Sequence, residues 1–413
     1  MTEEKTPGIS RRTLLTSSLA LAAARVGTAQ GASDQPKPGP HVAVVGAGAF
    51  GGWTAYELLR RGARVSLFDA WGPGNGRASS GGETRVIRTV YGVDELFTDL
   101  ALRALELWQI HEKRFRRPLY RRTGMLVLGA DPLILDAMPL LAERGVEIRE
   151  LDLASARRRF PQIDFDGLDH VYEDQGTGYL LARQACRTVV EHFVDEGGDF
   201  RRASVRPGPI EEGHLQNLEL SDGSRFAADH YVFACGSWMG RLFPKLLVQK
   251  IRPTRQEVHY FGPPAGDGRF SEDTLPIWTD RTSKGYYGIP GNLDRGFKIA
   301  KHALGEPFDP STSDRLPDPS QVESARAFLG RRFPAMAGAP LIESRVCHYA
   351  NTADAYFVAD RHPEAHNLWL LGGGSGHGFK HGPALGERMA QWVLGEAEIE
   401  PRFRLDAERG SQA

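Results

Sequence analysis

Two short groups of residues near the end of the chain have side chains that could take part in chemistry. Cys347-His348-Tyr349 follows Arg345, and further along a Gly-rich run ends in Gly376-His377-Gly378-Phe379-Lys380. A thiolate is the reactive form of cysteine, so nearby positive charge would favour a reactive Cys347, although an isolated free cysteine is more often buried and inert. Glycines let a backbone approach a flat or phosphorylated ligand closely. The two groups together therefore indicate a ligand site.

A pattern typical of dinucleotide binding stands at the start of the folded region. The apolar run His41–Val45 predicts a buried parallel strand, and a second strand over residues 64–68 ends in Asp69. Between them lie a predicted helix and, before it, the glycines of a Gly-X-Gly-X-X-Gly motif, Gly46, Gly48 and Gly51. The glycines permit a tight turn, a close pyrophosphate and close helix packing, and Asp69 can bond a ribose hydroxyl. An acid at this position favours NAD or FAD over NADP.

A polar loop after Asp69 favours FAD over NAD. Residues 74–88 are rich in glycine and include Ser79, Ser80, Arg85 and Arg88. Such a loop can wrap the second, bulkier half of a dinucleotide, whereas the alternative interpretation is a solvated loop with surface arginines.

The chain resembles monomeric sarcosine oxidase and N-methyltryptophan oxidase, which are D-amino-acid-oxidase-like flavoproteins. The resemblance covers nearly all of residues 41–395, in order, and is carried by Gly82–Gly92, Gly236–Trp238, Tyr287–Pro290, Gly296–Lys298, Cys347–Tyr349 and Gly376–Lys380. It implies FAD and an α/β fold in which a Rossmann-type FAD-binding domain is joined to an α+β substrate domain with a large antiparallel or mixed sheet. We expect the FAD-binding domain in residues 41–125, 181–245 and 346–397, and the substrate domain in residues 126–180 and 246–345. Helices are expected over 132–144, 181–195 and 320–332, and from Pro383 onward.

The resemblance also implies roles for single residues. Cys347 would hold FAD through a thioether to the 8α carbon, and Arg88 and Lys380 would bind the substrate carboxylate. Lys298, on a predicted strand, would assist the reduction of O₂, unless Lys301 faces inward instead. The remaining pocket residues would be His302 and an aromatic wall of Tyr91, Tyr287 and Tyr349. The cofactor-binding residues would be Gly46, Gly48, Gly51, Asp69, Ser79, Ser80, Arg85, Val205, Cys347, Gly374, Gly376, Gly378 and Lys380.

Some positions depart from the pattern of sarcosine oxidases. Ser80 and Gly81 stand where those enzymes carry two histidines, Glu83 is the acid of the loop, and Ala350 replaces a threonine. Sarcosine is therefore not favoured as the substrate, and we expect oxidation of a secondary amine, an N-methyl or cyclic amino acid, to an imine with O₂ reduced to H₂O₂. The alternatives are a dehydrogenase of the same fold that passes electrons to a quinone or cytochrome, and a non-catalytic flavin-containing export or assembly protein.

The composition of the 413 residues is that of an ordinary soluble chain, with 41% hydrophobic residues and a formal net charge of -1. Without a basic block, nucleic acid is not an expected partner, and without a run of about 18 apolar residues no stable membrane span is expected. We expect no metal, a small-molecule amine and O₂ as partners, and a monomer. The three cysteines make no disulfide framework, so Cys186 and Cys235 could pair only if geometry allows, and Cys235 is expected in the core.

The N-terminus resembles a twin-arginine export signal. Arg11 and Arg12 precede an apolar run to Ala24 and then small residues. We expect residues 1–32 to be a signal peptide, cleaved near Ala29 or Ala32. It would engage the twin-arginine export machinery and lead to a periplasmic location. The alternative is a disordered tail that happens to hold two arginines.

Overall fold

Two large sheets organise the computed structural model, which describes residues 39–407 apart from 283–284 and 294. The expected export signal, residues 1–32, lies outside the described residues. The helices are α1 (Ala49–Arg60), α2 (Glu95–Phe115), α3 (Pro132–Glu143), α4 (Leu153–Arg159), α5 (Ala182–Asp195), α6 (Met239–Leu242), α7 (Pro244–Leu247), α8 (Pro319–Arg332) and α9 (Gly382–Val393). The helix predicted after the glycine motif is α1, and those predicted over 132–144, 181–195 and 320–332 are α3, α5 and α8, whose ends agree within two residues. The helix predicted from Pro383 onward is α9, which begins at Gly382.

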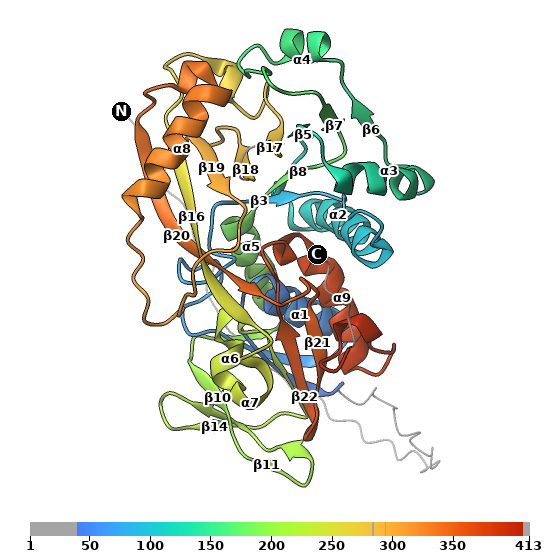
Figure 1. The fold of residues 1–413 in the computed structure, drawn as a ribbon. Helices are drawn as coiled ribbons and strands as arrows, with labels where there is room; N and C mark the ends of the chain where they lie inside the picture. Colours follow the sequence, from blue (N-terminus) through green and yellow to red (C-terminus); the bar gives the residue numbers. More distant parts are fainter. Residues whose placement is uncertain (1–38, 283–284, 294, 408–413) are drawn as a thin grey trace, which may run out of the picture. The chain divides into compact units, whose positions relative to one another are not determined.

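The first sheet has six strands in the order β21-β22-β15-β1-β2-β9. Its strands are β1 (His41–Val45), β2 (Arg64–Phe68), β9 (Asp199–Arg201), β15 (His230–Phe233), β21 (Val358–His362) and β22 (Ala365–Gly372). All neighbours pair in parallel except β21 with β22. α1 packs against this sheet and against α5 and α9 (Figure 1). The Rossmann-type sheet predicted from the sequence is confirmed, and its strands come from three distant parts of the chain.

The second sheet is mixed and has eight strands in the order β20-β16-β19-β18-β17-β5-β7-β6. These are β5 (Met125–Leu128), β6 (Ile148–Glu150), β7 (Val171–Asp174), β16 (Arg252–Phe261), β17 (Ile277–Asp280), β18 (Tyr286–Ile289), β19 (Phe297–Lys301) and β20 (Leu341–Asn351). Only β5 and β17 pair in parallel. One face is covered by α8, where Trp278 stacks on Phe328 with a ring separation of 5.7 Å. The expected large mixed sheet is therefore present.

In the described part of the chain, three smaller sheets accompany the two large ones. The sheet β3-β8-β4 contains β3 (Thr84–Ile87), β8 (Gly178–Leu181) and β4 (Tyr120–Arg121). The remaining strands are β10 (Val205–Pro207), β11 (Ile210–Glu211), β12 (His214–Leu215), β13 (Leu218–Leu220) and β14 (Arg225–Phe226). The domain boundaries stay a prediction. The one expected at residue 346 falls inside β20, a strand of the eight-stranded sheet.

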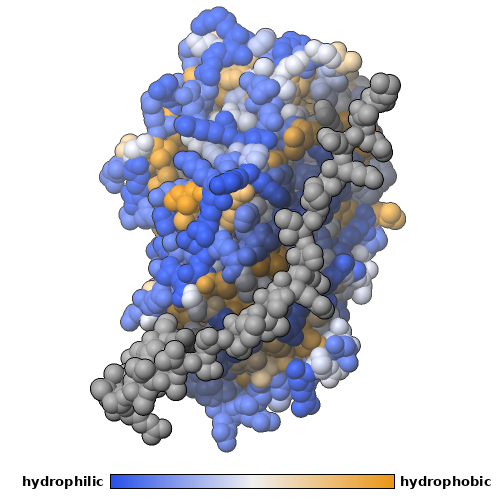
Figure 2. Space-filling model, turned by 180° about the vertical axis from the view of Figure 1, so that it is seen from behind, coloured by the Kyte–Doolittle hydropathy of each residue, from blue (hydrophilic) through white to orange (hydrophobic). Residues whose placement is uncertain are grey.

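Hydrophilic side chains predominate on the face shown in Figure 2, and apolar ones gather there in separate groups. Within the described ranges, no helix is both long enough and apolar enough to cross a membrane. The same residues contain no cluster of histidine, cysteine or acidic side chains arranged for a metal ion.

Candidate active site

A cavity of ≈ 760 Å³ lies at the carboxyl ends of the parallel strands. This edge is where open α/β sheets bind ligands, because the loops that follow the strands diverge there. Many of the expected cofactor-binding residues line it, namely Gly46, Gly48, Asp69, Ser79, Ser80, Arg85, Val205, Gly374, Gly376 and Gly378.

The glycine motif forms a cradle that side chains would fill. Gly46 has φ +105°, and a Cβ there would lie 2.5 Å from the carbonyl oxygen of Ala234. A Cβ on Gly51 would lie 1.9 Å from the carbonyl oxygen of Gly46. Gly48 is the N-cap of α1, where no side chain caps the helix and the first turn holds no acid. The helix N-terminus therefore presents amide groups and a positive dipole to the cavity, which fits the pyrophosphate of FAD.

Asp69 closes this cradle from the end of β2. Its carboxylate accepts hydrogen bonds from the backbone of Ala47 at 2.8 Å, Trp71 at 2.8 Å and Gly72 at 2.7 Å. These bonds fix the carboxylate at the cavity wall, where the sequence places a ribose.

Both cysteines considered for a disulfide are free. Cys186 is buried, as expected for a core residue, and burial raises the pKa of its thiol to about 11. The expectation of a core position for Cys235 is wrong in part, because its side chain is half-buried and lines the first cavity. The strand before it ends at Phe233, so Cys235 already belongs to the loop that turns into the ligand site.

A second, smaller cavity adjoins the first. Both are lined by Ala78, Arg85, Tyr349, Gly376 and Phe379. The second also contacts Cys347, Arg88, Lys380, Tyr287 and His302. The structure therefore brings the expected substrate-binding residues to one end of the expected FAD site, although they come from opposite ends of the chain.

Cys347 lies on β20 and lines the second cavity but not the first, whereas Tyr349, two residues on, lines both. The guanidinium Nη2 of Arg85 is 3.5 Å from its Sγ, and another Arg85 nitrogen donates to the carbonyl of Thr84 at 2.8 Å. The sequence pointed to Arg345 as the positive charge beside the thiol, and this is wrong. Arg345 lies on the same face of β20 as Cys347, but its guanidinium pairs with Glu83 at 3.1 Å and with Glu343 at 3.4 Å.

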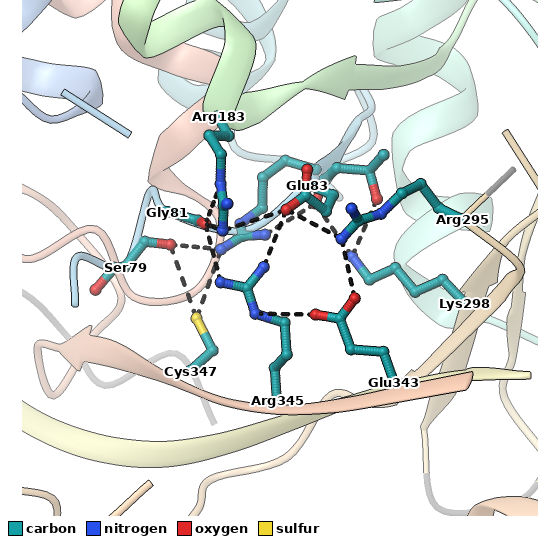
Figure 3. A network of polar contacts seen from close by, with 11 residues as sticks. Ser79, Gly81, Glu83, Arg183, Arg295, Lys298, Glu343, Arg345 and Cys347 are labelled. Carbon is teal, nitrogen blue, oxygen red and sulfur yellow. Dashed lines mark hydrogen bonds and ion pairs between the residues drawn. The ribbon is translucent and has the colours of Figure 1, made fainter. Parts of the chain in front are cut away.

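Figure 3 shows the network of charges around Arg345. One carboxylate oxygen of Glu83 lies 3.1 Å from Arg345, 3.2 Å from Arg183 and 3.3 Å from Arg295. Glu343 lies 2.9 Å from Arg295. Each partly exposed pair adds little stability alone, but the network ties the loop before β3 to β20 and α5. Sequence reasoning noted Glu83 only as a departure from the family pattern.

His348, next to Cys347, ties the same loop to the first cavity. Its Nε2 lies 2.7 Å from the carbonyl of Arg77, and its Nδ1 lies 2.7 Å from Oγ of Ser237 and 3.0 Å from Oγ of Ser79. Because a carbonyl only accepts, Nε2 carries the proton and Nδ1 accepts from the hydroxyls. Burial lowers the pKa of His348 to about 4, so the ring is neutral. The hydroxyl of Ser79 is therefore engaged by the protein.

Arg88 and Lys380 line the second cavity together. Lys380 is 3% exposed, and its Nζ donates to the hydroxyl of Tyr91 at 2.7 Å and to the carbonyl of His377 at 3.1 Å. The backbone carbonyl of Lys380 accepts from the indole of Trp108 on α2 at 2.7 Å. Burial, and then the charge of Arg88, lower the pKa of Lys380 well below its ordinary value. A bound carboxylate would therefore stabilise the charged form of both side chains.

The placement of Tyr91 in the aromatic wall is wrong. Its ring packs on Phe97 at 5.2 Å, and its hydroxyl meets Nδ1 of His377 at 3.1 Å and Nε2 of His381 at 2.7 Å as well as Lys380. Tyr91 therefore holds Lys380 from behind the cavity wall. Sequence reasoning missed His377 and His381 as supports of Lys380, although their spacing of four residues at the start of α9 was a usable signal.

Tyr287 and Tyr349 line the second cavity as expected, and His302 lies at its exposed end with Nδ1 3.4 Å from the hydroxyl of Tyr349. Lys298 is 2% exposed and donates to the carbonyl of Thr84 at 3.1 Å. Burial, and then the charge of Arg85, lower the pKa of Lys298 to about 7. Lys301, the alternative cation, is half-buried and lines the second cavity, whereas Lys298 is not among the residues that line either cavity.

An ion pair in the wall of the second cavity was missed altogether. Asp131 at the start of α3 and Arg281 after β17 lie 2.7 Å apart, and both line the cavity. An aspartate before a proline is typical of a helix N-cap, so the sequence around Asp131 indicated a capping role rather than a place in the cavity wall.

Comparison with known proteins agrees with this geometry. Residues 41–392 match the model of a family described as FAD dependent oxidoreductase. Monomeric sarcosine oxidase of Bacillus sp. (strain B-0618) is 30% identical over 362 residues, which cover 86% of this chain and 92% of that protein. N-methyl-L-tryptophan oxidase of Salmonella heidelberg (strain SL476) is 30% identical over 375 residues, covering 88% and 96%.

Solved structures share the fold at lower identity. L-proline dehydrogenase from P. horikoshii has a TM-score of 0.78 at 19% identity and covers 89% of this chain and 97% of its own. Fructosamine oxidase (Amadoriase II) from Aspergillus fumigatus has a TM-score of 0.75 at 22% identity, with 90% of each chain covered. At these identities the likeness concerns the fold alone.

Proposed function

This chain belongs to the family of FAD-dependent oxidoreductases, and we propose that it oxidises a secondary amine, an N-methyl or cyclic amino acid, to an imine while O₂ is reduced to H₂O₂. The relatives named for oxidation of sarcosine and of N-methyl-L-tryptophan support an amine as the substrate.

One observation carries the proposal: the second cavity places Arg88 and Lys380 beside Tyr349 and Gly376, which also line the FAD cavity. A guanidinium can hold two oxygens of a planar carboxylate, and Lys380 adds a second cation. An amino acid held by its carboxylate would therefore present its amine end toward the cofactor. Tyr287 and Tyr349 exclude water from that end and suit an uncharged amine.

FAD, when bound, accepts two electrons, so that the amine and O₂ become the imine and H₂O₂, and water then hydrolyses the imine. Lys298 is the proposed helper in the reduction of O₂, because a fixed cation stabilises negative charge as it develops on oxygen. Its position against Thr84, beside Arg85, keeps that cation buried behind the cavity wall.

We also propose a thioether between Sγ of Cys347 and the 8α carbon of FAD. Forming this bond removes two electrons and two protons, which O₂ takes up as H₂O₂. The support is the cation beside the thiol, since Arg85 at 3.5 Å favours the nucleophilic thiolate.

Export through the twin-arginine machinery to the periplasm is a further proposal, and it rests on Arg11, Arg12 and the apolar run after them. That route carries folded proteins, which suits an enzyme that takes up FAD before export. Replacing both arginines by lysine should retain active enzyme in the cytoplasm, as measured by fractionation. Unchanged periplasmic activity would contradict the export proposal.

The reaction is tested with a panel of N-methyl and cyclic amino acids. Under anaerobic conditions a true substrate should bleach the flavin absorbance, and in air it should yield peroxide in proportion to the imine formed. Bleaching without O₂ turnover would instead select a dehydrogenase that uses another acceptor. If none of the amines bleaches the flavin, the proposed amine oxidation is refuted.

A further inference from the structure

The second cavity carries a charged pair besides Arg88 and Lys380, formed by Asp131 and Arg281. Asp131 and Arg281 follow β5 and β17, which are neighbouring parallel strands and so end at the same edge of the sheet. Both side chains line the cavity, with Nε of Arg281 2.7 Å from Oδ2 of Asp131. Asp131 is 5% exposed, and its other oxygen accepts the backbone N–H of Leu133 at 3.1 Å as the cap of α3.

Arg281 has N–H donors that could bind a ligand. Its Nε forms an ion pair with Asp131, and among the described residues no hydrogen bond or ion pair involves its terminal nitrogens. A guanidinium held by one acid in this way presents the rest of its planar fork to a ligand, which matches the two oxygens of a carboxylate.

The charge balance of the cavity favours an anion there. Among the described residues that line it, six are basic and two are acidic: Arg85, Arg88, Arg281, Lys301, Arg345 and Lys380 against Asp131 and Glu257. Glu257 is already paired with Arg255 at 2.8 Å. The pKa of His302 is lowered first by desolvation and then by the charges of Arg88, Arg281 and Lys380, so these three cations surround one space. A cationic substrate side chain would need Asp131 as its partner, so it would have to displace Arg281 while the other cations repel it.

Apolar residues line the same cavity as the cations. They are Met125, Val127, Ile134, Ile277 and Trp278. A methylene chain fits such a wall, with one charged group at each end.

We infer that the amine substrate is an N-substituted or cyclic amino acid with a second carboxylate, one carboxylate bound by Arg88 and Lys380 and the other by Arg281. This inference rests on the proposed amine oxidation and specifies the substrate class of the same cavity.

Matched substrates test it directly. Both enantiomers of N-methyl-aspartate and N-methyl-glutamate are compared with N-methyl-asparagine, N-methyl-glutamine and N-methyl-lysine. The wild type should show kcat/KM about 10- to 100-fold higher for the acids than for the matching amides, since a charge-assisted hydrogen-bond pair is lost in the amide. Equal values, or a preference for N-methyl-lysine, would overturn the inference and leave the proposed oxidation intact.

Two variants assign the effect to Arg281. Arg281→Gln should remove the preference, mostly through KM, and should change the amides by less than about threefold. Asp131→Asn keeps a capping side chain and frees the charge of Arg281, so KM for the acids should fall. The matched control is Arg149→Gln, which breaks an exposed pair with Glu147 outside the cavity and should change neither ratio. An unchanged preference in Arg281→Gln would overturn the assignment.

A binding readout separates this inference from the reaction. Glutarate and butyrate lack an amine, so neither is oxidised, and their binding is followed by perturbation of the flavin absorbance. Glutarate should bind about 10-fold more tightly than butyrate to the wild type. The two ligands should bind Arg281→Gln with similar affinity. If no amine bleaches the flavin, the proposed oxidation fails, and this titration still decides whether the cavity takes a dicarboxylate.

Discussion

At the scale of single residues, the cations of this site differ in the groups that they contact. Lys380 donates a hydrogen bond to the hydroxyl of Tyr91, and Lys298 donates one to the carbonyl of Thr84. Arg85 contacts the sulfur of Cys347. Because each is largely buried, its charge is set by its neighbours and acts over short distances in a medium of low polarity. The charge of Lys298 and the reactivity of the Cys347 thiol can each be tested.

The reaction of reduced enzyme with O₂ should slow as pH rises through about 7. Lysine is charged below its pKa, and the pKa of Lys298 is about 7, so raising the pH removes the cation that assists O₂. Lys298→Met should lower the rate about 100-fold and abolish this pH dependence, as measured by stopped-flow reoxidation of pre-reduced enzyme.

Lys301→Met is the matched control for that experiment, because Lys301 lies on the same strand as Lys298 and lines the second cavity. It should leave the reoxidation rate within about threefold of the wild type. A large effect at Lys301 with none at Lys298 would reverse the assignment of the cation.

Cys347→Ser should release its flavin on denaturation. The wild type should give a yellow precipitate and a peptide containing Cys347 whose mass is raised by FAD. The control is Cys235→Ser, because Cys235 lines the FAD cavity but has Val45 rather than a cation as its sulfur partner. That variant should keep its flavin. Flavin released from the wild type would refute covalent attachment, without affecting the assignment of FAD.

At the scale of elements, the site is the meeting point of β3, β20 and the turn that leads into α9. The Glu83 network and His348 hold the loop before β3 against β20, and Gly376 lets the turn pass over the ring of Tyr349. Gly376 has φ +75°, and a Cβ there would lie 2.7 Å from Tyr349. The turn therefore needs glycine for two reasons, its backbone conformation and its contact.

Gly376→Ala and Gly395→Ala separate those two reasons. Gly395 has φ +72° with nothing within 4 Å of a built Cβ, so its substitution adds only backbone strain, about 1–2 kcal/mol of unfolding free energy. Gly376→Ala should cost more than this and should also raise KM, because Tyr349 must move. Denaturant unfolding and steady-state kinetics measure the two effects. Equal stability losses with unchanged KM would show that the contact with Tyr349 is unimportant.

At the scale of the whole molecule, the described residues, 39–407 apart from 283–284 and 294, belong to one compact unit. A chain that begins at Pro38 should therefore fold and take up FAD, with a melting temperature within about 2 °C of the full chain. Calorimetry and the ratio of flavin to protein absorbance measure this outcome. A failure to take up FAD would mean that the first 37 residues contribute to the fold.

The sequence by itself determined the elements whose signals are local. The glycine motif, the two apolar runs around it and the acid at Asp69 specify a nucleotide-binding β-α-β unit, because each feature acts within a few residues. The helices α3, α5, α8 and α9 were predicted from local residue patterns. The family motifs, spread in order over the chain, brought Cys347, Arg88 and Lys380 to the same site.

The tertiary structure alone decided which side chains touch. Arg85 rather than Arg345 lies on Cys347, Tyr91 supports Lys380 from behind, Cys235 enters the FAD cavity, and Asp131 pairs with Arg281. Each outcome depends on which strands become neighbours and on which way a side chain turns at a strand end. Residues as far apart as Tyr91 and Lys380 have no local signal that links them, so only the packed fold could join them.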